Sequence, residues 1–193
     1  MSEFIKKRVI KDLIDELADI DAVSLEIIGH KIIETLESKK LVHHGINKDY
    51  KPVGYTVDTF SQDFTVVGEY STEEKYFEDS SGGKNENRFD KIAKDIQHAV
   101  AKSGDTLPSK IYLISSAEEP ASFRGKFNKS DLAKQHAARV NFLDARELAK
   151  TIFQSSQDNA QAADFYRCYL PDFAQNLDNY EYYGRVPPAC VNH

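Results

Sequence analysis

The sequence GYTVDTFSQDFTVVGEYSTEEKYF, residues 54–77, decides the fold because its pattern is that of a β-hairpin. Residues 55–57 predict the end of one strand, and residues 59–63 predict a turn. Residues 64–71 are rich in β-branched and aromatic side chains and predict the second strand. An antiparallel pair of strands is therefore expected at the centre of the chain.

The hairpin is expected to place two carboxylates together. Asp58 lies at the end of the first predicted strand, and Glu69 lies late on the second. Successive strand residues point to opposite faces, so Glu69 shares a face with Ser71. Two converging carboxylates repel each other, and a hard divalent cation with oxygen ligands would relieve that repulsion. Each residue alone has an ordinary alternative, since Asp58 could cap a turn and Glu69 could be solvated at a strand end.

Helical periodicity precedes the hairpin. Residues 3–19 predict a first helix, and residues 24–38 predict a second with Ser24 as its N-cap. A short strand is expected at residues 41–44. The apolar face of the second helix is predicted to consist of Leu25, Ile28, Ile32 and Leu36.

Helices and strands alternate after the hairpin and a loop expected at residues 80–87. The expected elements are a helix at 88–102, a strand at 110–116, a helix at 130–137, a strand at 140–143 and a helix at 145–154 capped by Asp144. In the first of these helices, Lys91 is predicted to face solvent and Gln97 to lie at the edge of the apolar stripe. A hairpin followed by βα units predicts an α/β fold with a mixed sheet flanked by helices.

Composition limits the classes of function. The chain has 193 residues and a net charge of −6, so no basic surface extends over the whole chain to bind nucleic acid. The two cysteines lack zinc-ligand spacing, which favours free thiols in an intracellular protein. Neither a signal peptide nor a membrane-spanning stretch is apparent, and a cytoplasmic location is expected.

The pattern changes after Gln154. Residues 155–159 are polar and predict a linker, and residues 160–170 predict a helix that Pro171 ends. We therefore expect a domain over residues 1–154 and a C-terminal helical extension over residues 155–193. The extension has two interpretations: a linker toward a further domain, or an arm that packs back on the first.

The order of these elements, with an acidic residue on the helix before the hairpin, resembles the core of the PD-(D/E)XK nuclease superfamily. The segment LEIIGHKII, residues 25–33, is similar to the first core helix of its Mrr-like restriction endonuclease branch, with Glu26 as the acidic residue. The segment VNFLDARELAKTI, residues 140–152, looks like the terminal strand and helix of that branch. The resemblance covers residues 22–153 and implies a restriction-endonuclease-like fold.

The resemblance also implies magnesium- or manganese-assisted hydrolysis of phosphodiesters. Asp58 and Glu69 would hold the Mg²⁺ or Mn²⁺ ion, and Glu26 would add a ligand or orient a metal-bound water. Ser71 occupies the position at which the family carries a catalytic lysine. Lys75 is the expected source of the missing positive charge, Lys94 is less well placed, and Gln97 is a candidate polar group of the site.

Two classes of function follow from this departure. The first is a metal-dependent DNA endonuclease, the effector of a bacterial restriction or anti-phage defence system, activated when an attached domain assembles it into a homo-oligomer. The second is a catalytically inactive module that retains the fold to bind nucleic acid or protein. The run SFRGKFNK, residues 122–129, could contact phosphates or form an ordinary solvated loop.

Overall fold

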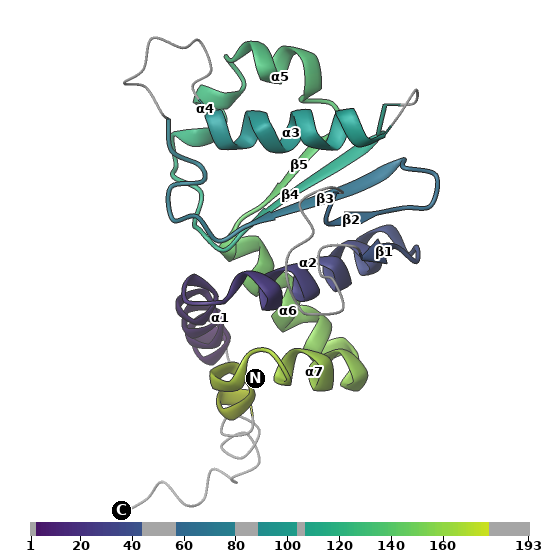
Figure 1. Ribbon diagram of the computed structural model, residues 1–193. Coiled ribbons are helices and arrows are strands. Elements are labelled where there is room, and N and C mark those ends of the chain that lie inside the picture. The colour runs from purple at the N-terminus through teal and green to yellow at the C-terminus, as the bar shows by residue number, and fades with distance from the viewer. Residues whose placement is uncertain (1–2, 44–56, 80–88, 104–106, 178–193) are drawn as a thin grey trace, which may run out of the picture.

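The computed structural model describes residues 3–43, 57–79, 89–103 and 107–177 of the chain. In these ranges five strands form one mixed sheet with helices on both faces, which confirms the predicted α/β fold (Figure 1). None of the helices in these ranges has the length and apolarity that crossing a membrane requires. The predictions for residues 44, 55–56, 80–88 and 178–193 fall outside the described residues.

The sheet has an antiparallel half and a parallel half. Its order is β1-β2-β3-β4-β5, in which β1, β2 and β3 are antiparallel neighbours and β3, β4 and β5 are parallel. The parallel strands are connected through helices that cross one face of the sheet. The strands are β1 (Val42–His43), β2 (Thr59–Phe60), β3 (Val66–Ser71), β4 (Lys110–Ser115) and β5 (Val140–Leu143).

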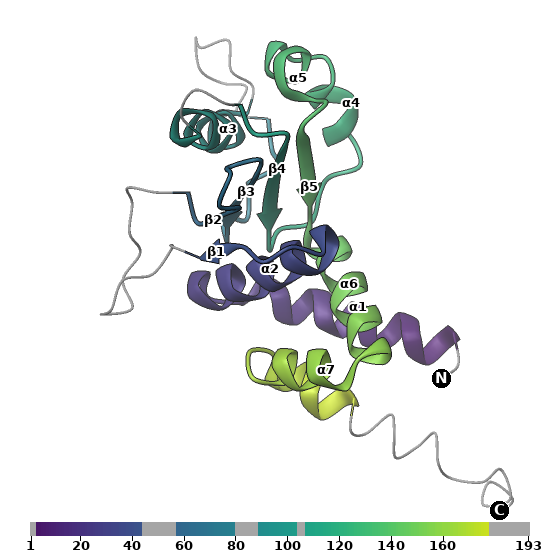
Figure 2. The same cartoon turned by 90° about the vertical axis from the view of Figure 1, so that its right-hand side faces the viewer.

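The helices form two layers. They are α1 (Glu3–Ala18), α2 (Ala22–Glu37), α3 (Asp90–Lys102), α4 (Phe123–Phe127), α5 (Asp131–His136), α6 (Ala145–Asp158) and α7 (Ala160–Arg167). The first two lie on one side of the sheet with α6 and α7, where α2 is closest to the strands and α7 packs against α6, whereas α3, α4 and α5 cover the other face (Figures 1 and 2).

Strand alternation fills both layers with apolar side chains. On β3, Val66 belongs to the core beneath α2, and its neighbour Val67 belongs to the core beneath α3. On β4, Ile114 and Leu113 divide in the same way. The near-continuous apolar sequence of these central strands follows from their burial on both faces.

The hairpin differs from the prediction in its register. Thr59 and Phe60, predicted as turn residues, form β2, and the second strand begins at Val66 rather than at residue 64. Phe64 lies in the turn with φ of 54°, a left-handed conformation that residues other than glycine seldom adopt. Asp58 therefore precedes β2 and does not end a strand.

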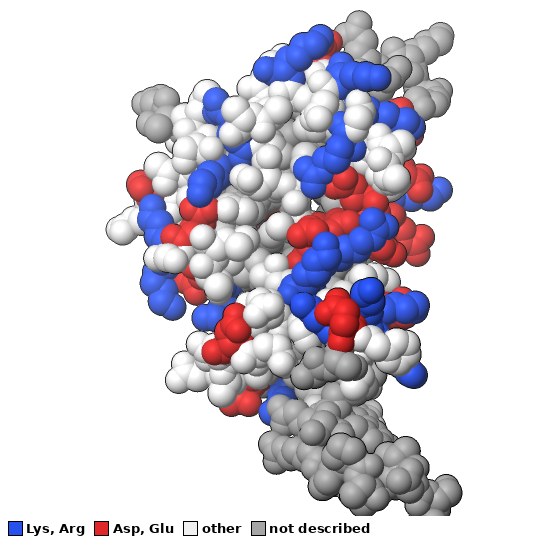
Figure 3. Space-filling model, turned by 180° about the vertical axis from the view of Figure 1, so that it is seen from behind, with Lys and Arg blue, Asp and Glu red and all other residues white. Residues whose placement is uncertain are grey.

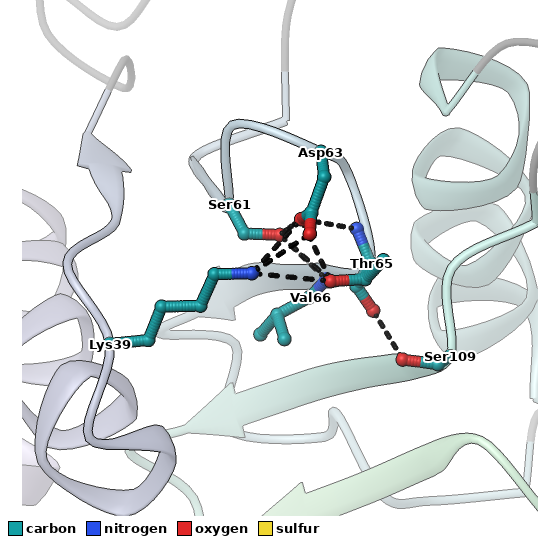
Figure 4. A network of polar contacts seen from close by, with 6 residues as sticks. All are labelled: Lys39, Ser61, Asp63, Thr65, Val66 and Ser109. Atoms are coloured by element: carbon teal, nitrogen blue, oxygen red, sulfur yellow. Dashed lines mark hydrogen bonds and ion pairs between the residues drawn. The ribbon is translucent and has the colours of Figure 1, made fainter.

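Side-chain hydrogen bonds stabilise this turn (Figure 4). The Asp63 carboxylate accepts from the Thr65 backbone N–H at 3.2 Å and from the Thr65 hydroxyl at 2.8 Å. The Lys39 ammonium, from the chain after α2, donates to both Asp63 oxygens at 3.1 and 3.0 Å. These bonds lower the pKa of Asp63, and they tie the turn to the end of α2.

Helix capping was predicted correctly in one case and wrongly in another. Asp144 caps α6 by accepting from the Glu147 backbone N–H at 3.0 Å, as expected. The second helix begins at Ala22, with Asp21 and not Ser24 as its N-cap, because the Asp21 carboxylate accepts from the Ser24 backbone N–H at 2.9 Å. Leu36, placed on its apolar face by the sequence, is 49% exposed.

The C-terminal helices share the core of α1, α2 and α6. Residues 155–158, predicted as linker, complete α6, so the expected boundary at residue 154 falls inside this helix. Tyr166, Leu170, Phe173 and Leu177 are buried in the same cluster as the apolar residues of α1.

Pro171 begins a helical segment instead of ending one. The predicted helix already ends at Arg167, and residues 171–177 are helical again. The Glu16 carboxylate accepts from the backbone N–H groups of Asp172 and Phe173 at 2.9 Å each. These bonds satisfy donors of the first helical turn that have no partner within the helix.

Close approach between α2 and the sheet depends on Gly29. A Cβ at this position would lie 2.7 Å from Cδ1 of Tyr70, closer still to Cε1, and 3.3 Å from Cδ1 of Ile114. The Tyr70 hydroxyl donates to the Thr59 hydroxyl at 2.6 Å, so the ring cannot move without breaking that bond. The missing side chain thus fixes how closely α2 lies against β3.

We expect Gly29→Ala to lower the free energy of unfolding by about 1–3 kcal/mol, because overpacking outweighs the roughly 1 kcal/mol gain in helix propensity. Gly125→Ala in α4 is the matched control, since a Cβ there meets nothing within 4 Å and should be neutral or stabilising. Urea denaturation of both variants checks the prediction. Equal stability of the two variants would contradict it.

Candidate functional site

The candidate site lies beside β3, just beyond the point where its pairing with β2 ends in the described part of the chain. Thr59 pairs with Gly68, and β2 does not continue in the direction that would cover the rest of β3. Asp58, one residue before Thr59, occupies that place, and its carboxylate accepts from the Tyr70 backbone N–H at 3.3 Å. A side chain thereby satisfies a β3 donor that a longer strand would have bonded.

A carboxylate cluster, defined as Glu26, Asp58, Glu69 and Asp95, surrounds this position. Asp58 and Glu69 lie close enough to change each other's pKa, the charge of Asp95 on α3 raises the pKa of both, and the charge of Asp58 raises the pKa of Glu26 on α2. Glu26, Glu69 and Asp95 are only 9%, 6% and 7% exposed. Asp58 and Glu69 therefore lie together with Asp95, and Glu26 approaches Asp58 from the layer of α2.

Burial without enough positive charge raises the pKa values of the cluster. Desolvation, followed by the charges of Asp58 and Asp95, raises the pKa of Glu69 to about 10. Desolvation also raises the pKa of Asp58 to about 6, and desolvation together with the Asp58 charge raises that of Glu26 to about 7. At neutral pH and without a cation, Glu69 is protonated and can donate to Asp58.

Helix α3 contributes a polar stripe that the sequence did not identify. Lys91, Asp95 and His98 are spaced i, i+4, i+7 and therefore share one helix face. Asp95 accepts from the Tyr76 hydroxyl at 2.8 Å, and His98 Nδ1 lies 2.8 Å from Glu69 Oε1. The available signal was the position of these residues beside the apolar stripe that contains Ile92, Ile96 and Ala99.

Lys91 is only partly exposed and its ammonium pairs with Asp95 beside the site, so it does not simply face solvent as the sequence predicted. Its Nζ lies 3.3 Å from Asp95 Oδ1 and 3.9 Å from Glu73 Oε1, and its side chain is 38% exposed. Its charge lowers the pKa of both Asp58 and Glu69, against the larger effect of burial.

The other predicted helpers lie differently. Lys75 is exposed in the turn after β3, and its ammonium has no ion pair or hydrogen bond with a described residue. Gln97 and Lys94 are exposed on α3. Ser71 is buried on the face of Glu69, and its hydroxyl accepts from the Glu73 backbone N–H at 3.3 Å, so it supports the turn and brings no charge.

Glu26 is the member of the cluster with an unused oxygen. Its Oε2 atom is buried and, within the described ranges, accepts no hydrogen bond. His43 Nε2 on β1 lies 3.9 Å away, too far for a hydrogen bond. A buried carboxylate oxygen without a donor is costly unless a proton or a cation accompanies it.

The carboxylate oxygens of the cluster suit a hard divalent cation as ligands. One of them, Glu26 Oε2, accepts no hydrogen bond from a described residue. In the described part of the chain, no three His, Cys, Asp or Glu side chains are already arranged around a common metal position.

The run at residues 122–129 is core-forming rather than an aromatic binding surface. Residues 123–127 form α4, and Phe123 and Phe127 are buried against Phe142. Arg124 pairs with Glu119 at 2.6 Å, so its guanidinium is engaged within the fold.

Comparison with known proteins identifies no relative. No protein-family model matches the chain, and no curated protein or solved structure matches it either.

The raised pKa of Glu69 predicts how stability depends on pH. Unfolding restores the ordinary value of 4.5, so above that pH unfolding releases the proton that folded Glu69 retains up to about pH 10. Stability of the metal-free protein should therefore fall from pH 7 to pH 9, by on the order of 2 kcal/mol.

Chemical denaturation in the presence of a chelator measures this dependence. Glu69→Gln should flatten the slope, because an amide cannot ionise, while the exposed Glu74→Gln should leave it unchanged. Stability that is constant or rises over this window in the unsubstituted protein would show that Glu69 is ionised in the folded state.

Proposed function

We propose that this chain is a metal-dependent endonuclease domain that hydrolyses phosphodiester bonds in DNA. The observation that carries the proposal is the buried, electrostatically coupled pair of Asp58 and Glu69 beside β3, with Glu26 on α2 close to Asp58. Mg²⁺ and Mn²⁺ take oxygen ligands, and either ion could displace the proton that Glu69 retains.

Each carboxylate has a distinct role in the proposal. Asp58 and Glu69 hold the cation, and Glu26 supplies a further oxygen through Oε2, which accepts no hydrogen bond within the described ranges. When bound, the cation neutralises phosphate charge and makes a bound water acidic enough to attack near neutral pH. Burial of the carboxylates favours binding, because the ion relieves both desolvation and mutual repulsion.

Lys91 supplies the positive charge that Ser71 cannot. Its ammonium lies beside the cluster, bound to Asp95, and its long, partly exposed side chain can turn toward a phosphate at the pair. A cation at that position would stabilise negative charge on the phosphate oxygens as the bond breaks. Lys91 therefore takes the role that the sequence suggested for Lys75.

An isolated domain is expected to bind DNA weakly. The net charge is −6, and Figure 3 shows Lys and Arg interspersed with Asp and Glu on the face opposite that of Figure 1. Phosphate contacts by basic residues supply most non-specific affinity, so assembly into a homo-oligomer through an attached domain would raise local concentration on DNA. The setting in cytoplasmic restriction or anti-phage defence rests on the Mrr-like resemblance.

A cleavage assay tests the site. Plasmid DNA is incubated with Mg²⁺ or Mn²⁺, and with a chelator as control, using both the chain alone and the chain fused to a self-assembling domain. We expect cutting mainly by the fusion, and Asp58→Asn or Glu69→Gln should reduce it to the level of the chelator control. Glu74→Gln, an exposed change nearby, should leave cutting intact.

Two outcomes would contradict the proposal in different ways. Undiminished cutting by the Glu69→Gln fusion would reject the assigned site. DNA binding without any metal-dependent cutting by the unsubstituted fusion would instead favour the non-catalytic module.

Lys91 and Lys75 form a matched pair for a second test. Lys91→Ala should slow cleavage on the order of 100-fold, because it removes charge stabilisation from the transition state. Lys75→Ala removes the same charge from an exposed turn and should have little effect. Cleavage rates at saturating metal measure the difference, and equal effects of the two changes would refute the role of Lys91.

A further inference from the structure

His98 makes a direct contact with the candidate metal site that neither its sequence position nor the proposed function explains. Its Nδ1 atom lies 2.8 Å from Glu69 Oε1, and its ring is 33% exposed while the Glu69 side chain is 8% exposed. The ring thus stands between a buried carboxyl group and solvent. Nε2 has no hydrogen bond to a described residue, so Nδ1 makes the ring's polar contact with the site.

The position of the ring is fixed by the packing of α3. Ile92, Ile96 and Ala99 on this helix are completely buried against the sheet. His98 follows Ile96 by two positions and precedes Ala99, so it lies at the rim of the buried face and meets β3 at Glu69. Rotation or translation of α3 would disturb the core, and the imidazole therefore has little freedom relative to this strand.

The Glu69 carboxyl group has a close contact with His98 and lies beside Asp58. Its Oε1 atom faces His98 Nδ1, and the charge of Asp58 raises the pKa of Glu69. With the proton on Nδ1, the imidazole donates to Oε1 and fixes the rotation of the carboxyl plane. A carboxylate held in one orientation loses less conformational entropy when it binds a cation.

We infer that His98 is a positioning residue for Glu69, whose Nδ1–H···Oε1 hydrogen bond orients the carboxylate for a divalent cation and thereby raises metal affinity. This inference rests on the proposed function, because it requires a cation at Asp58 and Glu69. Groups that hydrogen-bond metal ligands in this way commonly change affinity by 10- to 100-fold when they are removed.

A direct coordinating role is the competing explanation, and ion preference separates the two. Imidazole nitrogen binds Mn²⁺ better than Mg²⁺, which strongly prefers oxygen ligands. If His98 only orients Glu69, its removal lowers the affinity for both ions by similar factors. If it were a ligand, its removal would weaken Mn²⁺ far more than Mg²⁺.

The test measures binding of Mn²⁺ by isothermal titration calorimetry on the full chain, with Mg²⁺ measured by competition. His98→Leu removes the hydrogen-bond donor and should lower the affinity for both ions about 10-fold. His98→Asn keeps an N–H close to the position of Nδ1 and should retain most of the affinity. Lys94→Ala, an exposed change on the same helix, is the control, and circular dichroism verifies that each variant is folded.

The outcomes distinguish failure of the inference from failure of the proposed function. Unchanged affinity in His98→Leu, equal losses in His98→Leu and His98→Asn, or a loss confined to Mn²⁺ would each overturn the positioning role while the metal site stands. Asp58→Asn provides the other control. Absence of binding by the unsubstituted chain, or undiminished binding by Asp58→Asn, would reject the metal site and the inference with it.

Discussion

β2 contributes only Thr59 and Phe60 to the sheet, and on that side no strand among the described residues pairs with β3 beyond Gly68. A backbone donor at a buried edge needs an acceptor, and the carboxylate of Asp58 provides one for Tyr70. This requirement brings Asp58 next to Glu69 in a desolvated position. Like charges in such a place require a proton or a cation, so the length of one short strand determines the chemistry available to the site.

Both helical layers converge on this edge. From one side, α2 approaches closely enough for Glu26 to influence Asp58, since Gly29 leaves room for the Tyr70 ring. From the other side, α3 presents Lys91, Asp95 and His98. The site is therefore assembled from two faces of the sheet, and neither layer alone contains its donors and its positive charge.

Much of the fold could be predicted because apolar periodicity is strong in its central elements, as in β5, where residues 140–143 match the prediction. Asp58 and Glu69 could be paired because a hairpin brings neighbouring segments together. The roles of Lys91 and His98 could not be predicted, because periodicity defines a helix face but not which strand its rim meets. The polar composition of residues 155–158 predicted a linker, but these residues remain helical, and the Gln154 side chain donates a hydrogen bond to Asp158.

The contact of Glu16 with the segment at residues 171–177 has a mechanical consequence. The Glu16 carboxylate on α1 accepts hydrogen bonds from the backbone N–H groups of Asp172 and Phe173, and apolar side chains of both segments share one core. A pulling force applied at Leu177 would act on these hydrogen bonds and on the packing against α1 before it acted on the sheet. The contacts within the layer of α1, α2, α6 and α7 would thus yield first, and β3, which carries Glu69, would keep its register with its neighbouring strands.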